Sequence, residues 1–387
     1  MPETLKKITG TTVAFGDVVQ LSKERSQDPA ADGFERYVGL EHLEPSDLKV
    51  RSWGDIADGT TFTNVFRSGQ VLFGKRRAYQ RKVAVPDFGG VCSGDIYVLE
   101  PRDDRLLPEL LPFICQSEPF YDYVISMSQG GLSPRVNWKA LAKYEVALPP
   151  PEEQRRIAGV LLSIEVLNNK LLQVATSCLA TLGSCRDTWF GISTSSTSTL
   201  GGLCERGAGI QIGPFGAQLH QSDYTPEGVP VVMPSDLGDD SISMDQIARV
   251  SPDKADQLGQ HRLQVGDIVL PRRGDLDRRA LVTEEHKGWL CGTGCLRIRL
   301  DDVSLAEAVV QSLSSASVLR WLESRAVGTT MPNLNSKIVA GVPVQIPERV
   351  GDALDLVRQL IENLESTRAR IAKLTRMRSN LLSEVLR

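Results

Sequence analysis

The stretch GGLSPRVNWKALAKYEVALPP at residues 130–150 has a counterpart in GTTMPNLNSKIVAGVPVQIPE at residues 328–348. The glycine, proline, asparagine and lysine that the two stretches share stand at a constant offset of 198 residues: Gly130, Pro134, Asn137 and Lys139 against Gly328, Pro332, Asn335 and Lys337. A fixed offset held over several positions indicates an internal duplication, which decides how the rest of the chain is interpreted.

An earlier pair of segments supports the duplication. Gly69 opens GQVLFGKRRAYQRKVAV and Gly266 opens GDIVLPRRGDLDRRALV; each is a β-rich run, then arginines, then a second apolar run. Each copy also contains short strands with Gly/Pro turns, a helical stretch, and a strand that ends in proline. We therefore predict an α+β fold with two similar α+β domains.

A long helix is predicted after each copy. Pro151 suits the first turn of the first helix, and its apolar residues recur at steps of three and four. The predicted seam of this helix is Ile157, Val160, Ile164, Leu167, Leu171 and Val174, and that of the second is Leu354, Val357, Ile361, Leu364, Ile371 and Leu374. A stutter is expected near Thr367 and Arg368. Each helix could pack on its own domain, but their equivalent places in the two copies favour pairing with each other.

The predicted organisation has four parts. Residues 1–150 form the first domain and residues 151–192 the first helix. Residues 193–347 hold a linker and the second domain, and residues 348–387 form the second helix. Within the linker, the polar run STSSTSTLGG indicates a flexible boundary before the second domain.

Composition restricts the class of protein. The chain has 387 residues, no run of 18 apolar residues and an N-terminus without an apolar signal region, so neither a membrane helix nor secretion is expected. Seven scattered cysteines predict reduced thiols in the cytoplasm, without a zinc set. The net charge of −4 argues weakly against nucleic acid, but it leaves room for local basic surfaces.

Catalytic patterns are hard to find in the sequence. None of the four histidines has metalloprotease spacing, and no Asn/Asp-Pro-Pro-aromatic tetrapeptide of a base methyltransferase occurs. Residues 69–76 match a phosphate-binding loop only superficially, because apolar strand formers fill it and Arg76 replaces the hydroxyl residue. We therefore expect a chain without catalysis, metal or cofactor of its own.

Two basic clusters are the main candidates for DNA contacts. The first basic block (residues 75–82) and the second basic block (residues 272–279) occupy equivalent places in the two copies. Their candidate residues are Lys75, Arg76, Arg77, Arg81 and Lys82 in the first, and Arg272, Arg273, Arg278 and Arg279 in the second. Arginine suits phosphate oxygens and the guanine edge. One such block alone would be a solvated hairpin face, and its recurrence favours DNA.

Two loops add further candidates. The first closing loop (residues 129–137) and the second closing loop (residues 327–337), with a lysine shortly after the asparagine of the first, carry amide and cationic donors. The candidates are Arg135, Asn137 and Lys139 in the first copy, and Asn333, Asn335 and Lys337 in the second. Asparagine can read adenine, but it is also common in turns for backbone reasons, and both interpretations stay open.

The segment ALPPPEEQRRIAGVL at residues 147–161 resembles the Pro-Pro-x-x-Glu-Gln-Arg-Arg-Ile box of type I restriction-modification specificity subunits. GTTMPNLNSKIVAGVPVQIP and GIQIGPFGAQLHQSDYTPEGVPVV resemble segments that close and open a recognition domain in that family. The resemblance covers nearly the whole chain. It adds Gln154, Arg155 and Arg156 to the residues expected in partner contacts or helix pairing.

The resemblance implies a division of labour. Each domain reads one half of a split double-stranded DNA site, and the helices pair antiparallel as a coiled coil with pseudo-twofold symmetry that sets the spacing. Methyltransferase subunits, two in number, dock on the chain and methylate adenine, and a separate restriction subunit cuts DNA. S-adenosylmethionine, ATP and Mg²⁺ are expected only on these partners.

Two departures from the family pattern affect partner docking. The second helix opens with IPERVGD instead of the box, and Glu165 stands near a position where aspartate is usual. Two other functions are compatible with the residues. One is a stand-alone nuclease, which would need a carboxylate–lysine metal site, and the other is a coiled-coil adaptor without a DNA role.

Overall fold

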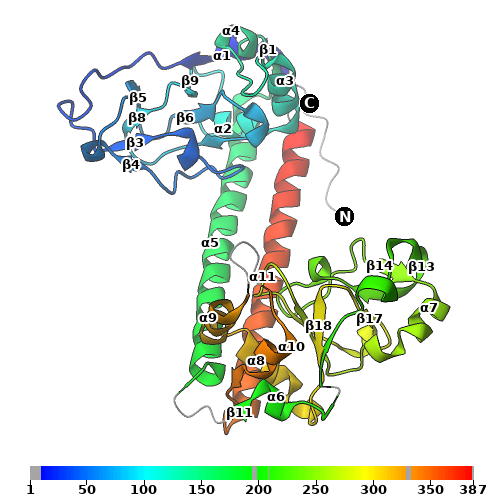
Figure 1. Cartoon of the computed structure of the whole chain (residues 1–387). Helices are drawn as coiled ribbons and strands as arrows, with labels where there is room; N and C mark the ends of the chain where they lie inside the picture. The colour runs from blue at the N-terminus through cyan, green and yellow to red at the C-terminus, as the bar shows by residue number, and fades with distance from the viewer. Residues whose placement is uncertain (1–9, 194–197, 208, 328–332, 386–387) are drawn as a thin grey trace. The chain divides into compact units, whose positions relative to one another are not determined.

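The computed structural model describes residues 10–193, 198–207, 209–327 and 333–385 (Figure 1). Its contacts divide the chain into two compact units. Unit 1 comprises Met1–Leu172 with Arg368–Arg387, and unit 2 comprises Gln173–Thr367. Each long helix is therefore shared between the units, whereas the sequence predicts it as a segment of its own.

Unit 1 is an α+β unit whose described residues form two four-stranded sheets and one two-stranded sheet. Their orders are β2-β9-β6-β7, β4-β3-β8-β5 and β1-β10. The strands are β1 (Thr11–Ala14), β2 (Val19–Leu21), β3 (Arg36–Val38), β4 (Gly54–Asp55), β5 (Asn64–Phe66), β6 (Val71–Gly74), β7 (Val83–Ala84), β8 (Gly90–Cys92), β9 (Ile96–Pro101) and β10 (Glu145–Leu148). The α-helices are α1 (Phe15–Val18), α2 (Leu111–Gln116), α3 (Glu118–Met127) and α4 (Trp138–Leu141), followed by α5 (Pro151–Phe190).

Unit 2 has sheets of order β12-β18-β15-β16, β14-β13-β17 and β11-β19 in its described residues. The strands are β11 (Ser198–Thr199), β12 (Ile210–Ile212), β13 (Tyr224–Val232), β14 (Ala248–Val250), β15 (Ile268–Pro271), β16 (Ala280–Leu281), β17 (Leu290–Cys291), β18 (Cys295–Ile298) and β19 (Pro343–Val344). The α-helices are α6 (Leu200–Leu203), α7 (Pro252–Gln257), α8 (Ala306–Leu313), α9 (Ala316–Arg325) and α10 (Ser336–Ala340), followed by α11 (Val350–Val385).

The two units repeat one topology, which confirms the predicted duplication. The parallel pair β3–β8 of unit 1 corresponds to β13–β17 of unit 2, and the antiparallel pair β6–β9 corresponds to β15–β18. The registers agree as well, because Val38 pairs with Cys92 and Val232 pairs with Cys291. Of the positions aligned in the sequence, Gly328 and Pro332 lie outside the described residues.

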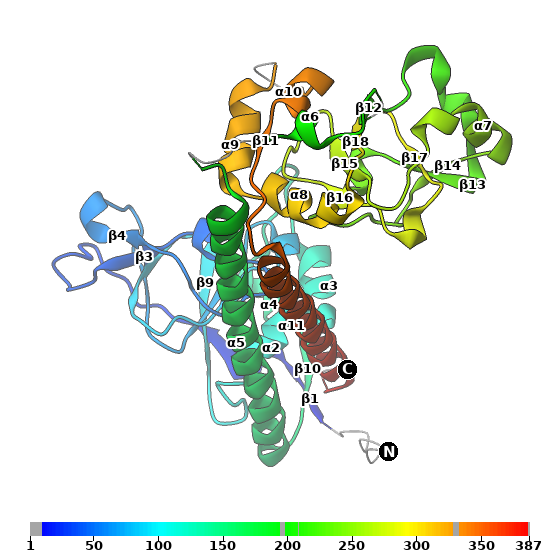
Figure 2. The ribbon, with the colours of Figure 1, turned by 90° about the horizontal axis from the view of Figure 1, so that it is seen from below.

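The long helices pack both on their own unit and on each other, so both interpretations left open by the sequence hold. In unit 1, Ile157 and Leu161 of α5 share a core with Leu382 of α11 and with residues of α2 and α3. In unit 2, Phe190 of α5 shares a core with Leu354 of α11 and with α8. Within each unit the two helical segments run antiparallel (Figures 1 and 2).

The predicted seam of α5 is partly wrong. Ile157 and Ile164 are buried and Leu171 is half-buried, as expected. By contrast, Val160, Leu167 and Val174 are 43%, 46% and 47% exposed. The covered positions between the correct ones are Leu161, Asn168 and Ala175. Apolar periodicity alone does not favour an asparagine or an alanine over a nearby valine or leucine, so every second position of the predicted seam lies one residue too early.

The seam of α11 agrees better with the prediction. Leu354, Val357 and Leu364 are buried, and Ile361, Ile371 and Leu374 are half-buried. Thr367 is buried as well, so two successive steps of three residues, from 361 to 364 and from 364 to 367, shift the pattern where the irregularity was expected. The Thr367 hydroxyl donates to the carbonyl of Asn363 (2.7 Å), which satisfies this polar group inside the helix.

By length and composition alone, α5 could cross a membrane, because an 18-residue stretch of it has a mean hydropathy of 1.3. This finding differs from the expectation, which rested on uninterrupted apolar runs. Only 17% of that stretch is buried within the chain. Several apolar side chains of α5 are exposed, among them Val160, Leu167 and Val174, on a helix that also packs into two folded units. An uncovered apolar face of this kind is typical of a protein-docking surface.

Candidate nucleic-acid interface

In unit 1, the start of the first basic block lies beside the first closing loop. The amide of Val136 donates to the carbonyl of Lys75 (3.0 Å), and the amide of Arg77 donates to the carbonyl of Pro134 (2.7 Å). These bonds come from backbone groups, so they fix the two segments to each other whatever the side chains do. The two groups of candidates in this copy therefore belong to one surface.

Unit 2 has the same juxtaposition. The amide of Leu334 donates to the carbonyl of Arg272 (2.8 Å), and Nε of Arg272 donates to the carbonyl of Leu334 (3.2 Å). Arg273 and Asn333 form a β-bridge, as Arg76 and Arg135 do in unit 1. The duplicated fold thus brings a basic block and a closing loop together twice, which neither segment's sequence alone predicts.

Two arginines of unit 1 share one carboxylate. Nη1 of Arg76 donates to Asp95 Oδ2 (3.2 Å), and Nε of Arg135 donates to Asp95 Oδ1 (2.9 Å). Burial raises the pKa of Asp95, but the hydrogen bonds from Arg135 and Arg76 outweigh it and leave the pKa below its usual value. Nε of Arg76 also donates to the hydroxyl of Ser133 (2.5 Å). Asp95 therefore joins the basic block to the loop and neutralises part of their charge.

The other end of the first basic block is held by contacts within unit 1. The guanidinium of Arg81 donates to both carboxylate oxygens of Glu118 and lies 5.2 Å from the ring centroid of Tyr121. Nζ of Lys82 donates to the carbonyl of Leu40 (2.7 Å). Both cations have partners in the free chain, so they are weaker candidates for DNA contacts than the sequence predicts.

Two cations of unit 1 remain open. The side chains of Arg77 and Lys139 are exposed, and neither has a hydrogen-bond or ion-pair partner among the described residues. Arg77 has φ +52° and lies in the left-handed region, which costs an L-residue about 1 kcal/mol. Its amide bond to Pro134 holds it there. Among the predicted residues of unit 1, these two side chains are the most accessible hydrogen-bond donors for a phosphate group.

The prediction that Arg279 contacts DNA is wrong. Its side chain is buried, at 3% exposure, and its Nε lies 3.5 Å from Asp240 Oδ1. Asp240 also accepts from Nη2 of Arg186 on α5 (2.8 Å), and Nε of Arg186 donates to Gln311 Oε1 (2.8 Å). Burial lowers the pKa of Arg279, although the nearby carboxylates of Asp240 and Asp239 act in the opposite direction. The sequence shows four arginines in one block, but it does not show that one of them turns inward.

The remaining cations of unit 2 differ in how free they are. Arg278 is bound locally, since its Nε donates to Asp275 Oδ2 (3.0 Å) and its Nη1 to the carbonyl of Leu237 (3.4 Å). Arg273 and Lys337 are exposed. Lys337 is the counterpart of Lys139, whereas Arg273 stands at the position that Arg76 has in unit 1.

The loop asparagines have a backbone role. Oδ1 of Asn137 accepts from the amide of Ala140 (2.8 Å), and Oδ1 of Asn335 accepts from the amide of Ile338 (2.8 Å). Each asparagine thereby caps the short helix that follows it, α4 or α10. The interpretation as turn chemistry accounts for these two amide oxygens. Asn333 is half-buried at the base of its loop.

The residues expected in partner contacts differ in their exposure. Gln154 is buried, with Oε1 accepting from the amide of Leu107 (2.8 Å) and Nε2 donating to the carbonyl of Arg105 (2.8 Å). Gln154 therefore attaches the start of α5 to its own unit, and it is closed to a partner. Arg155 and Arg156 are exposed and pair only with glutamates one turn earlier.

Two features of unit 1 are not predicted from the sequence. Leu132 is 97% exposed at the tip of the first closing loop, next to Gly131. The adjacent glycines mark a turn, which is the one signal that could have pointed to this apolar tip. The second feature is a pocket that contains Arg25 and Asn64, two residues outside both basic blocks. Its parts are distant in sequence, and no local pattern predicts it.

No group of three or more His, Cys, Asp or Glu side chains suited to a metal occurs among the residues that the structure describes. Cys291 and Cys295, the closest cysteine pair in sequence, are both buried, and burial raises the pKa of Cys291 to about 12. A thiol in that state is a poor metal ligand and a poor nucleophile.

Comparison with known proteins gives one consistent result. Residues 11–176 match the type I restriction modification DNA specificity domain. A stretch of 130 residues, 31% of this chain, is 28% identical to the type I restriction enzyme EcoDI specificity subunit of Escherichia coli and spans 28% of that relative.

Solved structures resemble the whole chain. The type I restriction-modification S subunit from M. genitalium matches with a TM-score of 0.61 and 14% identity, covering 100% of this chain and 98% of that one. A chain from a structure on complex assembly and conformational transition of the type I R-M system matches with a TM-score of 0.59 and 20% identity, covering 99% of both chains. At these identities the structural likeness concerns the fold.

Proposed function

Residues 11–176 belong to the type I restriction modification DNA specificity domain family, and from this premise we propose that the whole chain is the DNA-reading specificity subunit of a type I restriction-modification complex. It recognises a split double-stranded DNA site, one half with each unit. It has no catalytic role of its own. The observation that carries the proposal is the recurrence, in both units, of a basic block bonded to a closing loop.

The two surfaces have the chemistry that DNA recognition needs. Exposed Arg77 and Lys139 in unit 1 and Arg273 and Lys337 in unit 2 can each neutralise a phosphate. The two sets differ in their details: a carboxylate is shared at Asp95 in unit 1, whereas Arg279 is withdrawn into unit 2. Similar folds with different side chains suit a protein whose halves read different bases.

The uncovered face of α5 suits a protein partner. In unit 1 it includes Leu162, Val166 and Leu167, which line a shallow cavity of about 320 Å³ together with Ser163 and Lys170. We assign this face to a modification subunit, with two such subunits and a restriction subunit in the full complex. S-adenosylmethionine, ATP and Mg²⁺ act on those subunits. We place the site of action in the cytoplasm.

Methylation mapping tests this function. The adenine methylation pattern of the host genome is compared before and after removal of the gene, and again after its return with Arg77 and Arg273 both changed to Gln. Loss of one split motif with the gene, and weak recovery with the double variant, is expected. An unchanged pattern in the deletion would refute the proposed function. Cleavage of DNA by the purified chain with Mg²⁺ alone would favour a stand-alone nuclease.

A further inference from the structure

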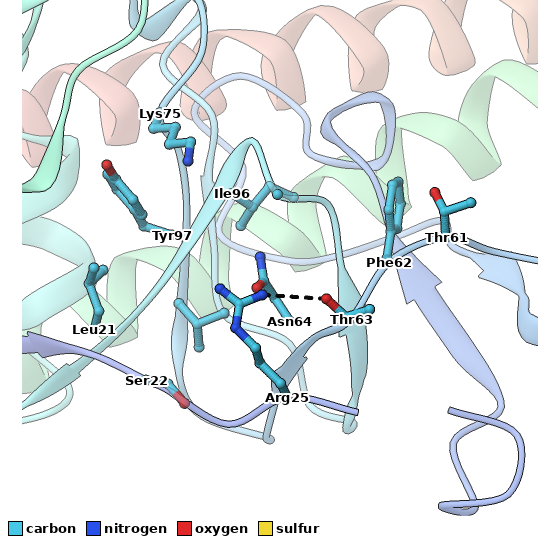
Figure 3. Close-up of a pocket in the computed structure, with 12 residues that line it drawn as sticks. Leu21, Ser22, Arg25, Thr61, Phe62, Thr63, Asn64, Lys75, Ile96 and Tyr97 are labelled. Carbon is cyan, nitrogen blue, oxygen red and sulfur yellow. Dashed lines mark hydrogen bonds between the residues drawn. The ribbon is translucent and has the colours of Figure 1, made fainter. Parts of the chain in front are cut away.

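A pocket of about 410 Å³ opens in unit 1 beside the first basic block (Figure 3). Its lining comes from segments that lie far apart in the sequence. Arg25 follows β2, Thr63 and Asn64 lie at the start of β5, Lys75 follows β6, and Tyr97 lies on β9. The pocket therefore exists only when the strands of unit 1 are assembled.

The charges in this pocket are all positive. Arg25 and Lys75 are the ionised residues among the described lining residues, and no carboxylate lines it. Two acids adjacent in sequence to lining residues pair elsewhere: Glu24, beside Arg25, pairs with Arg67, and Asp95, beside Ile96, pairs with Arg76. Figure 3 shows both cationic groups directed into the space. A concave site with two uncompensated cations attracts an anion.

The pocket holds its donors in place. Nη1 of Arg25 donates to the hydroxyl of Thr63 (3.4 Å), and Nζ of Lys75 lies 4.7 Å from the ring centroid of Tyr97. The hydroxyl of Tyr97 donates to the carbonyl of Val136 in the first closing loop (3.3 Å). Through Tyr97 the pocket is thus attached to the candidate DNA surface, and it keeps two cations oriented before any ligand arrives.

In unit 2 larger side chains stand at the equivalent strand positions. In unit 1 the strand positions at its floor are Ser22 and Val98. Their topological counterparts on β12 and β18 are Gln211 and Arg297, which pair across the sheet. Arg297 is 2% exposed, and its Nη2 donates to Gln211 Oε1 (2.8 Å). The topology therefore accepts larger side chains at these positions, so the small Ser22 and Val98 are a feature of unit 1 and not a requirement of the topology.

We propose that this pocket binds a phosphate group of the DNA backbone through Arg25 and Lys75. The inference rests on the proposed function, and it assigns DNA contact to Arg25, which lies outside both basic blocks. The ligand chemistry is a phosphate, which a free nucleotide also carries. The test separates these two sources.

The experiment uses the full chain and a fluorescein-labelled 30-base-pair duplex of mixed sequence, with affinity measured by anisotropy over a range of salt concentrations. The double variant Arg25→Gln with Lys75→Gln is expected to reduce the slope of log affinity against log salt by about 0.9, the value for one phosphate, and each single variant to reduce it by part of that amount. Arg25→Lys keeps the charge and should keep the slope. Arg102→Gln is the matched control, because Arg102 is exposed in the same unit at the opposite end of β9.

The outcomes are distinct. Unchanged slopes in both glutamine variants, with salt-dependent binding of the parent chain intact, would overturn the pocket while leaving the proposed function in place. No salt-dependent binding by the parent chain, alone or with its modification subunits, would instead defeat the proposed function. Saturable binding of ATP or dAMP that Arg25→Gln abolishes, with an unchanged DNA slope, would assign the pocket to a free nucleotide and refute the DNA backbone. Equal melting temperatures confirm that the variants are folded.

Discussion

Arg378 of α11 donates a hydrogen bond to the carboxylate of Glu165 of α5, and the two side chains are only 13% and 12% exposed. This pair joins the two long helices within unit 1. Glu165 also stands near a position where the family resemblance leads one to expect an aspartate. The longer side chain is used for helix pairing, so the departure has a structural explanation.

Removal of one partner of this pair should destabilise unit 1. Glu165→Gln leaves Arg378 without its countercharge in a largely covered position, and the expected loss is about 1–3 kcal/mol of unfolding free energy. Thermal and urea unfolding measure it. The exchanged pair Glu165→Arg with Arg378→Glu should recover part of the loss. If the single variant and the parent chain unfold alike, the pair contributes nothing to helix pairing.

The observed seam predicts different losses of stability for substitutions at two leucines of α5 that lie six residues apart in the sequence. Leu161 is fully buried in the core of unit 1, so Leu161→Asp should cost several kcal/mol. Leu167 is exposed, so Leu167→Asp should change stability by about 0.5 kcal/mol or less. The same Leu167 variant should lose binding to the modification subunit, measured by copurification. Unfolding of the Leu167→Asp variant would instead place Leu167 in the seam between the helices.

The fold was largely predictable from the sequence, whereas the site was predictable only in part. The duplication follows from residues with strict backbone roles, such as the capping Asn137 and Asn335, which keep their spacing because a helix must start there. Side-chain partners have no such signature. Arg279 and Arg273 lie in one block, yet burial against Asp240 depends on a loop some 40 residues away in the sequence. The pocket around Arg25 depends on four separate strands and could not be predicted locally.

Variants at two arginines should distinguish a residue that contacts DNA from one that supports the fold. Arg77→Asn removes a free charge at a left-handed position that asparagine tolerates, so stability should hold while the salt slope of DNA binding falls by about 0.9. Arg279→Leu should leave the slope unchanged and alter stability, because it leaves Asp240 with one fewer countercharge. Anisotropy titrations and thermal unfolding give both readings. Equal slope losses in the two variants would contradict the placement of Arg279.

Asp95 should make the DNA surface of unit 1 sensitive to acid. Its pKa lies below the usual value in the folded chain, so the stability it contributes is present above the unfolded pKa of about 4 and is lost as pH falls through the folded value. Its arginine partners are partly exposed, so the contribution is about 1 kcal/mol. Asp95→Asn should remove the part of acid unfolding that falls below pH 4.

The same variant should bind DNA more tightly, because Arg76 and Arg135 lose the carboxylate that neutralises them. Asp104→Asn is the control, since it removes one negative charge from an exposed position of the same unit. A larger gain for Asp95→Asn than for Asp104→Asn is expected at low salt. Equal gains would mean that only the overall charge of the unit matters.

Leu132 supplies a contact of a different kind. Its apolar side chain is 97% exposed at the tip of the closing loop that carries Arg135, so it can meet a thymine methyl group or a base step in a groove. Leu132→Ser should weaken DNA binding by about 1 kcal/mol, or about fivefold, without a change in the salt slope, because an apolar contact releases no counterion. Leu132→Met should bind like the parent chain, and neither variant should change the melting temperature. A reduced slope in Leu132→Ser would show that the substitution had moved the neighbouring arginines, and unchanged affinity would remove the loop tip from the DNA interface.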